Sequence, residues 1–326
     1  MLKSELVQTD KHSIKISLRR KNLRFLRRTN HIQTRWQQAE MTKIKNNIKF
    51  INEELIEKDS YLWRYIDLHK FLSFIFNKSL FFSRLDKFED KNEGISLKQV
   101  YYQNLKRKLD NHPKFDNIRK IMSIDMLGPE MNKIEDDLRI IQRFNFANCW
   151  FLGNQNIESV AMWNLYSNPD SIAIKINYAD FKKTIIENGF ENDDEESEII
   201  CSPIKYFDFQ KTTDFIAHST NLNDSVFQKD ISFEHEKEYR LIIKEKTREI
   251  PEIYYKPNMS RKGAELVYNS SFNYPGIELK LENFEKYNFE IIFHPKTQDW
   301  LKENIKKIVT LSNIELKISE SKLELR

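Results

Sequence analysis

Short apolar runs, each about as long as one β-strand, are separated along this chain by segments with helical periodicity. The run YLWRYI (61–66) is followed by an amphipathic segment over 67–78, with Asp67 at the expected N-cap, and then by SLFFS (79–83). Strands that alternate with inserted helices predict the α+β class. We expect a central, mixed and largely antiparallel sheet with helices inserted between its strands.

The same reading extends to the rest of the chain. Further strands are expected at 144–152, 171–177, 199–209, 233–243, 276–281, 289–294 and 312–318. Further helices are expected over 44–55, 95–145 with breaks, 157–167, 178–189 and 295–309, the last with Pro295 in its first turn.

Composition excludes several classes of protein. The 326 residues include 6 glycines, no two of them close together, which argues against a glycine-rich phosphate loop. Cys149 and Cys201 lie far apart, so neither a disulfide framework nor a CxxC zinc site is expected. No apolar run approaches the roughly 20 residues that span a bilayer, and the charged start has no apolar signal core. We therefore expect a cytoplasmic protein without a membrane segment.

Charge is distributed unevenly between two parts of the chain. Residues 1–45 hold twelve Lys and Arg against three Asp and Glu, a local net charge of +9, which leaves −5 for residues 46–326. We expect two parts, a basic N-terminal arm over 1–45 and one main domain over 46–326. A basic arm suits contact with nucleic acid or with a protein partner, although it is also compatible with a solvated extension.

The segment FEHEKEYRLII (233–243) places Glu234, Glu236 and Glu238 at alternate positions before an apolar run. If the whole segment is a strand, the three carboxylates share one face and require a positive neighbour. Arg64 is the first candidate for this neighbour. Alternatively, Glu236 or Glu238 forms a structural ion pair with Arg240 or Arg64.

Four stretches together resemble one bacterial family. They are LWRYIDLHKFLSFIFNKSLFFSRLDKFEDKNEG (62–94), NCWFLGNQNIESVAMWNLYSNPDSIAIKIN (148–177), FEHEKEYRLII (233–243) and FEIIFHPKTQDWLKENIKKIV (289–309). Their order and spacing resemble the domain of unknown function 2971 family, over roughly residues 60–310. The family's usual histidine and glycine after its Met-Trp motif are here Pro169 and Ser171. The name of this family implies no activity.

The layout also resembles, more distantly, the ADP-ribosyltransferases. Those enzymes place an Arg or His on a first strand, a Ser or Tyr on a second, and a Glu-x-Glu pair on a later one. Arg64, Ser83 and the pair Glu236 and Glu238 follow that order here. The resemblance implies NAD as the cofactor and a bacterial effector, such as a toxin or a phage-defence protein.

The chemistry of such a site assigns a role to each residue type. Cleavage of the nicotinamide–ribose bond builds up positive charge, which Glu238 would stabilise while holding a ribose hydroxyl. Glu236 would orient the acceptor, and Arg64 would bind the pyrophosphate through its fork of donors. Tyr65, Trp163 or Tyr166 would stack on a ring of NAD, although Trp163 and Tyr166, three apart on a helix, also fit a core position.

Two further functions stay open. The acidic body could be a non-enzymatic interaction module, with the arm as its contact to nucleic acid or to a partner. The carboxylates Asp86, Glu89, Asp90 and Glu93 could instead hold a divalent cation for a nuclease, or form a solvated turn. A nuclease requires that they converge with Glu236 and Glu238. The histidines show no ligand spacing, so no zinc site is expected.

Overall fold

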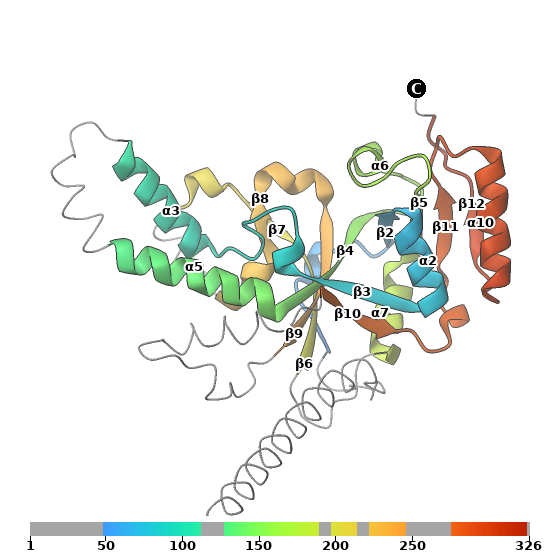
Figure 1. Ribbon diagram of the computed structural model, residues 1–326, viewed down its shortest axis with the longest axis horizontal. Helices are drawn as coiled ribbons and strands as arrows, with labels where there is room; N and C mark the ends of the chain where they lie inside the picture. Colours follow the sequence, from blue (N-terminus) through green and yellow to red (C-terminus); the bar gives the residue numbers. More distant parts are fainter. Residues whose placement is uncertain (1–47, 112–126, 189–196, 214–221, 246–274, 325–326) are drawn as a thin grey trace, which may run out of the picture. The chain divides into compact units, whose positions relative to one another are not determined.

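The computed structural model describes residues 48–111, 127–188, 197–213, 222–245 and 275–324 (Figure 1). Its strands are β1 (Ile48–Phe50), β2 (Ser60–Ile66), β3 (Ser79–Arg84), β4 (Asn145–Asn154), β5 (Ile172–Asn177), β6 (Ser197–Pro203), β7 (Lys205–Phe207), β8 (Gln228–Asp230), β9 (Glu238–Glu245), β10 (Gly276–Lys280), β11 (Glu290–Phe293) and β12 (Lys317–Ser319). Its α-helices are α2 (Leu68–Asn77), α3 (Leu97–Asp110), α5 (Leu127–Phe144), α6 (Val160–Tyr166), α7 (Tyr178–Asn188) and α10 (Asp299–Leu311). The predicted basic arm, residues 1–45, lies outside the described residues.

Ten of the strands form one sheet. Along its main path the order is β1-β6-β9-β4-β2-β5-β11-β12, and β3 joins it by pairing with β4 and with β10. The pairs β1–β6 and β11–β12 are parallel, and the other pairs of this sheet are antiparallel. The predicted α+β class with a mixed, largely antiparallel sheet is therefore confirmed.

The segment β2-α2-β3 forms as the sequence predicts. The Asp67 carboxylate accepts a hydrogen bond of 2.8 Å from the Lys70 backbone N–H, which caps the first turn of α2. The helix ends at Asn77, the next residue Lys78 has a φ of 48° in the left-handed region, and β3 follows at once. This tight connection lets α2 pack back on the sheet.

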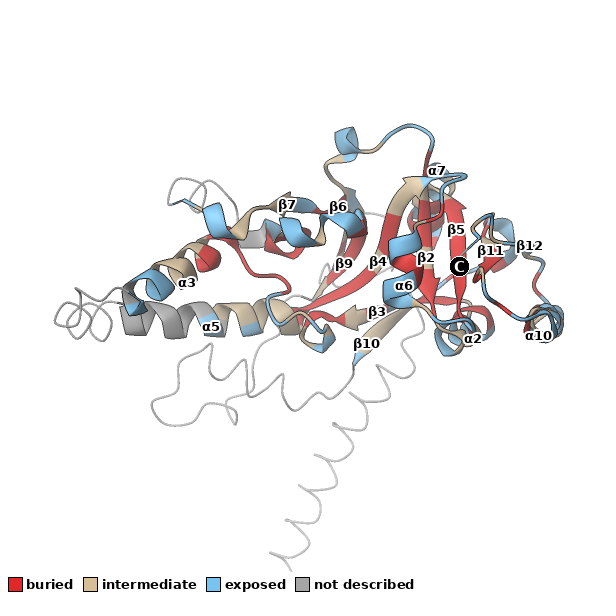
Figure 2. Cartoon of the chain, turned by 90° about the horizontal axis from the view of Figure 1, so that it is seen from above, coloured by how far each residue is buried: buried red, intermediate tan, exposed pale blue. Residues whose placement is uncertain are grey.

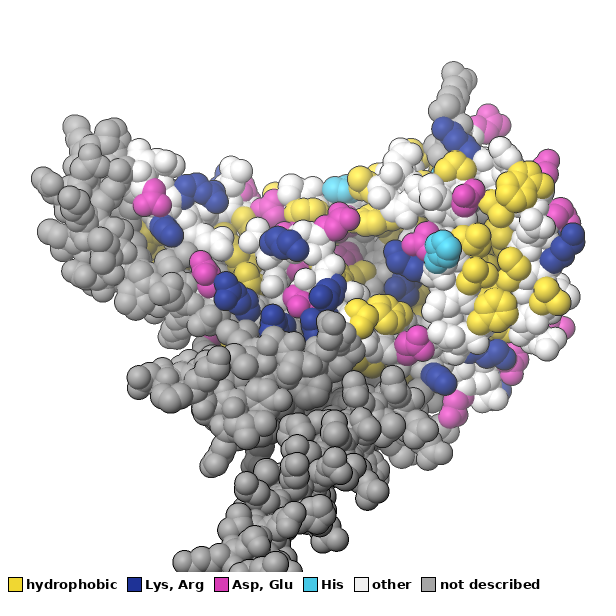
Figure 3. Space-filling view, in the orientation of Figure 1, with side chains coloured by type: hydrophobic (Ala, Val, Ile, Leu, Met, Phe, Trp, Pro, Cys, Tyr) yellow, Lys and Arg dark blue, Asp and Glu magenta, His cyan; other side chains and the backbone are white. Residues whose placement is uncertain are grey.

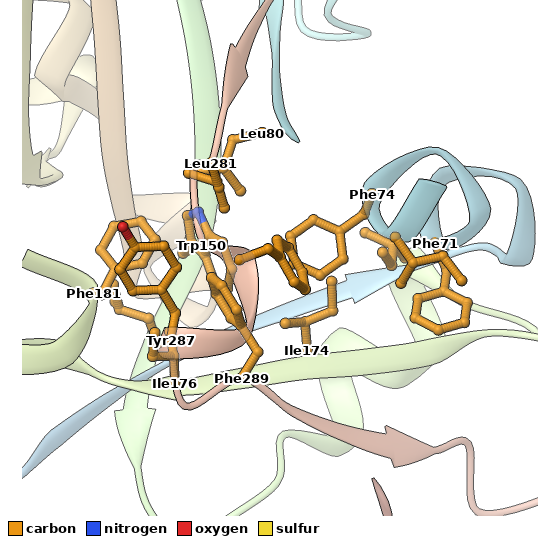
Figure 4. Close-up of a cluster of buried hydrophobic side chains, with 14 of the residues drawn as sticks. Phe71, Phe74, Leu80, Trp150, Ile174, Ile176, Phe181, Leu281, Tyr287 and Phe289 are labelled. Atoms are coloured by element: carbon orange, nitrogen blue, oxygen red, sulfur yellow. The ribbon is translucent and has the colours of Figure 1, made fainter. Parts of the chain in front are cut away.

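The two faces of the sheet carry different cores. On one face, α2, α7 and α10 bury Phe71, Phe181 and Ile305 against strand residues that include Trp150 and Ile174 (Figures 2 and 4). The opposite face has two smaller clusters. One contains Met162 and Trp163 of α6 with Trp63 and Tyr65, and the other contains Leu85, Val226 and Ile242. None of the described helices is long and apolar enough to cross a membrane.

Some predicted boundaries are wrong. The predicted helix over 44–55 is not formed as one helix in its described part: Ile48–Phe50 is a strand paired in parallel with Ile199–Cys201 of β6, and Glu53–Leu55 is a single 3-10 turn. The last helix begins at Asp299 and not at Pro295, because the backbone N–H of Thr297 bonds to the carbonyl of His294 in a preceding turn. In both places the observed conformation depends on contacts that the helical pattern does not encode.

Candidate functional site

The predicted strand over 233–243 is two elements. Residues Ile231–Glu236 form a 3-10 helix, called η6, and β9 starts only at Glu238. Between them Lys237 has a φ of 37°, in the left-handed region. This turn breaks the alternation, so the three glutamates do not share one strand face. Glu234 is exposed, whereas Glu236 and Glu238 are buried.

Glu236 and Glu238 belong to a buried ionic cluster of five side chains, Glu93, Lys229, Glu236, Glu238 and Arg240. Arg240 donates from Nε and Nη2 to the two carboxylate oxygens of Glu238, at 2.7 and 2.9 Å, and from Nη2 to Glu93 Oε2 at 2.8 Å. Lys229 Nζ lies 2.6 Å from Glu236 Oε2 and 3.6 Å from Glu238 Oε2. The positive neighbours of the glutamates are thus Arg240 and Lys229, and the prediction that Arg64 fills this place is wrong.

Two tyrosines form hydrogen bonds with residues of the ionic cluster, and one of them is exposed. The Tyr206 hydroxyl accepts a hydrogen bond of 2.9 Å from the backbone N–H of Glu238. The Tyr166 hydroxyl donates to Glu236 Oε1 at 2.6 Å, and 47% of Tyr166 is exposed. Tyr166 is therefore an exposed residue in direct contact with the cluster.

The surroundings shift the pKa values of Glu238 and Glu93, which both bond to Arg240, in opposite directions. Burial opposes ionisation of Glu238, but Arg240 and Lys229 outweigh it and lower the pKa of Glu238 to about 2. Burial dominates at Glu93 and raises the pKa of that carboxyl despite Arg240. Burial, reinforced by Glu238, also raises the pKa of the Cys149 thiol, which disfavours a thiolate nucleophile.

The low pKa of Glu238 gives an acid-sensitive contribution to stability. A carboxyl with a depressed folded pKa stabilises the protein above its ordinary value of 4.5, and this contribution is lost as pH falls toward 2. We expect wild type to lose about 2 kcal/mol of its stability advantage over Glu238→Gln when the pH falls from 5 to 3. Urea unfolding at both pH values measures this difference.

A control and a contrary result define this pH prediction. Glu303 is exposed on α10 and pairs with Lys306, so Glu303→Gln should show no comparable change between the two pH values. Glu93 acts with the opposite sign, because the stability linked to a raised carboxyl pKa is lost as pH rises. A difference between wild type and Glu238→Gln that stays constant from pH 5 to pH 3 would contradict the assigned role of Glu238.

Trp163 and Tyr65, both predicted to stack on a ligand, pack in the core beneath α6. Trp163 is 0% exposed, its ring centroid lies 4.8 Å from that of Tyr65, and its indole N–H donates to Glu158 Oε2 at 3.0 Å. The Tyr65 hydroxyl accepts a hydrogen bond from the backbone N–H of Ser159. The structure favours the core interpretation for both rings and leaves Tyr166 as the accessible one.

Arg64 and Ser83 lie apart from the ionic cluster. Strand register places Arg64 opposite Ile174, on the face that carries Trp150, whereas Glu238 points to the other face with Phe151. Ser83 is half-buried opposite Ala147, on the same face as Glu238. The structure therefore joins Glu236, Glu238 and Tyr166 directly, but not Arg64.

The carboxylates over 86–93 do not converge as a nuclease would require. Asp86 pairs with Arg84 at 2.7 Å, and Asp90 accepts a hydrogen bond from the backbone of Asn92. Glu93 is the one of the four that the structure places in the ionic cluster. Within the described residues, no group of three or more His, Cys, Asp or Glu side chains could hold a metal ion.

Sequence patterns did not indicate Lys229 or Glu93 as partners in the cluster. Glu93 was visible only as part of an acidic loop, where Gly94, with a φ of 77°, reverses the chain after it. Lys229 lies on β8, which belongs to a separate two-stranded sheet with β7. Both reach Arg240 or Glu236 by tertiary packing, which no local spacing reports.

Comparison with known proteins gives one match. The model of a family described as "Protein of unknown function (DUF2971)" matches residues 162–241, which run from α6 to β9. The resemblance to this family is thus confirmed for the segment that contains Tyr166, Glu236 and Glu238. No curated protein and no solved structure matches the chain. The resemblance to ADP-ribosyltransferases stays a prediction.

Proposed function

We propose that this chain, which carries the DUF2971 segment, is an enzyme that cleaves the nicotinamide–ribose bond of NAD and transfers ADP-ribose. The observation that supports this proposal is the ionic cluster, where an ionised Glu238 and a Glu93 of raised pKa share Arg240 close to an exposed Tyr166. Carboxyl groups whose pKa values are driven apart at one place are typical of catalytic sites. NAD is a substrate in this proposal.

The hydrogen bonds suggest which carboxylate a substrate would reach. Both oxygens of Glu238 bond to Arg240, and Glu236 Oε2 bonds to Lys229. Glu236 Oε1 bonds to the exposed Tyr166 hydroxyl, which a ribose hydroxyl or an acceptor could displace. We therefore assign contact with the substrate to Glu236 and fixed negative charge beside the reacting ribose to Glu238, a revision of the roles expected from sequence.

The proposed reaction breaks one bond and forms one. The bond between C1′ of the ribose and the ring nitrogen of nicotinamide breaks, and its electron pair leaves with neutral nicotinamide. C1′ then bonds to an oxygen or nitrogen of the acceptor, whose proton passes to Glu236. The developing positive charge on the ribose is stabilised by the carboxylates, which Arg240 and Lys229 hold in place.

Nicotinamide release from NAD tests this function. Wild type is expected to release nicotinamide at millimolar NAD, and Glu238→Gln is expected to reduce the rate at least about 100-fold, by loss of a fixed charge in a buried site. Tyr166→Phe removes only the displaceable hydroxyl and should stay within about tenfold of wild type. Chromatography of the products measures all three rates.

The controls separate catalysis from folding. Glu303→Gln, on the exposed face of α10, should behave as wild type, and circular dichroism should confirm that Glu238→Gln is folded. If Glu238→Gln does not fold, Glu236→Gln provides the second test. Wild-type turnover in a folded Glu238→Gln, or no turnover by wild type, would overturn the proposal. An effector role in bacteria, as a toxin or in phage defence, further requires that expression lower cellular NAD.

Exposed apolar side chains around α6 favour the second candidate, a non-enzymatic interaction module. Most of the large apolar side chains over 157–166 lie outside the core: Ile157, Val160, Leu165 and Tyr166 are exposed, whereas Met162 is buried with Trp163. Several exposed apolar residues gathered on a short helix and just before it are typical of a contact surface. Under this alternative, Glu238→Gln would change stability without any NAD turnover to lose.

A further inference from the structure

One edge of β4 is shared by two strands that diverge. β3 pairs with β4 at Phe146 and Ala147, and β2 pairs with it from Phe151 to Asn154. The opposite edge of β4 pairs with β9 from Asn145 to Phe151 without interruption. Among the described strands, none pairs with residues 148–150 on the first edge, and we call this opening the fork.

Polar backbone groups of β4 point into the fork. The backbone N–H of Leu152 donates to Lys237 O, on the side of β9. Because backbone groups alternate in direction along a strand, the N–H and C=O of Cys149 point the other way, toward the fork. On the β3 side of the fork, the side-chain amide of Asn148 donates a hydrogen bond of 2.8 Å to the carbonyl of Phe81. The fork is thus lined by backbone polar groups that have no β-ladder partner in the described part of the chain.

Arg64 stands at the mouth of the fork, one residue after Trp63, where β2 leaves β4. Its Cζ lies 5.7 Å from the ring centroid of Trp150. No hydrogen bond or ion pair joins the Arg64 guanidinium to any of the residues that the structure describes. By contrast, Arg84 and Arg240 are paired with Asp86 and Glu238.

The environment of Arg64 makes this isolation costly. Burial, only partly offset by Cys149, lowers the pKa of Arg64 to about 10. A guanidinium that is removed from bulk water loses its hydration, and without an anionic partner no other interaction compensates for that loss. Arg64 is only half-buried, however, so part of its side chain stays open to a small ligand. Figure 3 shows a recess over β4, next to β3 and α2, with Lys or Arg side chains on its wall.

We propose that the fork binds a phosphate-type oxyanion. Arg64 offers two parallel N–H donors to such a group, and the backbone N–H of Cys149 adds a third donor from the strand edge. The site goes beyond the proposed NAD chemistry, because it requires an anion and no reaction. The anion is either a free phosphate or diphosphate, or the diphosphate of a nucleotide.

Calorimetry at constant ionic strength tests the site with inorganic pyrophosphate and with ADP-ribose. Wild type should bind pyrophosphate with a Kd below about 1 mM, and Arg64→Gln should weaken binding at least about tenfold. Arg139→Gln is the matched control, because that guanidinium is exposed on α5 beside Glu135. Binding of both ligands indicates a nucleotide diphosphate, and binding of pyrophosphate alone indicates free phosphate. Binding of neither, or equal binding by Arg64→Gln, overturns the proposal.

Two further readouts separate the site from a structural role and from the proposed enzyme. If Arg64 is an unpaired charge kept for a ligand, Arg64→Gln should be at least as resistant to urea as wild type. If Arg64 instead has a structural role, Arg64→Gln should be less resistant to urea and should bind pyrophosphate as wild type does. Arg64→Lys, which keeps the charge but not the fork of donors, should bind more weakly than wild type. Glu238→Gln should bind pyrophosphate as wild type does, even if NAD turnover proves absent.

Discussion

Replacing Arg240 with methionine is expected to lower the free energy of unfolding by about 3–5 kcal/mol, the usual effect of removing one partner of a buried ion pair. Arg240 is 0% exposed and makes charge-assisted bonds to both Glu238 and Glu93. Methionine keeps an unbranched apolar stem but not the guanidinium, so the hydrogen bond of 2.8 Å from Arg240 to the carbonyl of Val226 is lost as well. The loss comes from two buried carboxyl groups, Glu93 and Glu238, that no longer have Arg240 as an ion-pair partner. Urea unfolding at neutral pH measures it.

The arrangement of the cluster provides the comparison for this prediction. Arg139→Met, at an exposed ion pair on α5, should change stability by less than about 1 kcal/mol. Adding Glu238→Leu to Arg240→Met should recover part of the loss, because one unpaired charge is removed together with its partner. If the free energy of unfolding of Arg240→Met lies within about 1 kcal/mol of the wild-type value, the cluster does not hold its carboxylates by charge.

Arg240 also connects stability to the proposed activity. It fixes the orientation of Glu238 through two parallel hydrogen bonds, at 2.7 and 2.9 Å. A carboxylate that is positioned before substrate arrives stabilises a developing positive charge without reorganisation. A variant of Arg240 that still folds should therefore lose NAD turnover together with Glu238→Gln, if the proposed function is right.

Local signals predicted those parts of the fold that local interactions determine. The cap at Asp67 and the apolar periodicity of α2 were sufficient for β2-α2-β3, because each element there is specified by its own residues and by a short connection. The strand β1 was missed because its conformation depends on Ile199–Cys201 of β6, about 150 residues away. The same limit applies to Glu238, which the sequence indicated, and to its partner Glu93, which it did not.

The candidate site shows how strand register decides what spacing alone leaves open. The alternative of a structural pair between Glu238 and Arg240 followed from their separation by two residues on one strand, and the structure contains that pair. The expected contact between Arg64 and the glutamates failed, because pairing with β5 turns Arg64 to the opposite face. The left-handed residue Lys237 is not a glycine or an asparagine, the residue types that usually indicate such a turn. The sequence therefore predicts a strand where η6 ends.

Trp163→Ala is expected to destabilise the protein by about 3–5 kcal/mol, as is usual when a large aromatic side chain is removed from a core. Trp163 is fully buried between Tyr65 and His294, with ring centroids at 4.8 and 5.0 Å. Its indole N–H also leaves Glu158 Oε2 when it is removed, although Ser321 continues to donate to that oxygen. Thermal and urea unfolding measure the loss.

Tyr166→Ala is the matched control for Trp163→Ala, because both residues lie on α6 three positions apart. Tyr166 is half-exposed and its removal should cost less than about 1.5 kcal/mol, mainly through its hydrogen bond to Glu236. If Trp163 instead served as a platform for a ligand, Trp163→Ala would keep its stability and lose ligand affinity. The buried ring predicts the opposite order, with stability lost at Trp163 and any effect on a ligand concentrated at Tyr166.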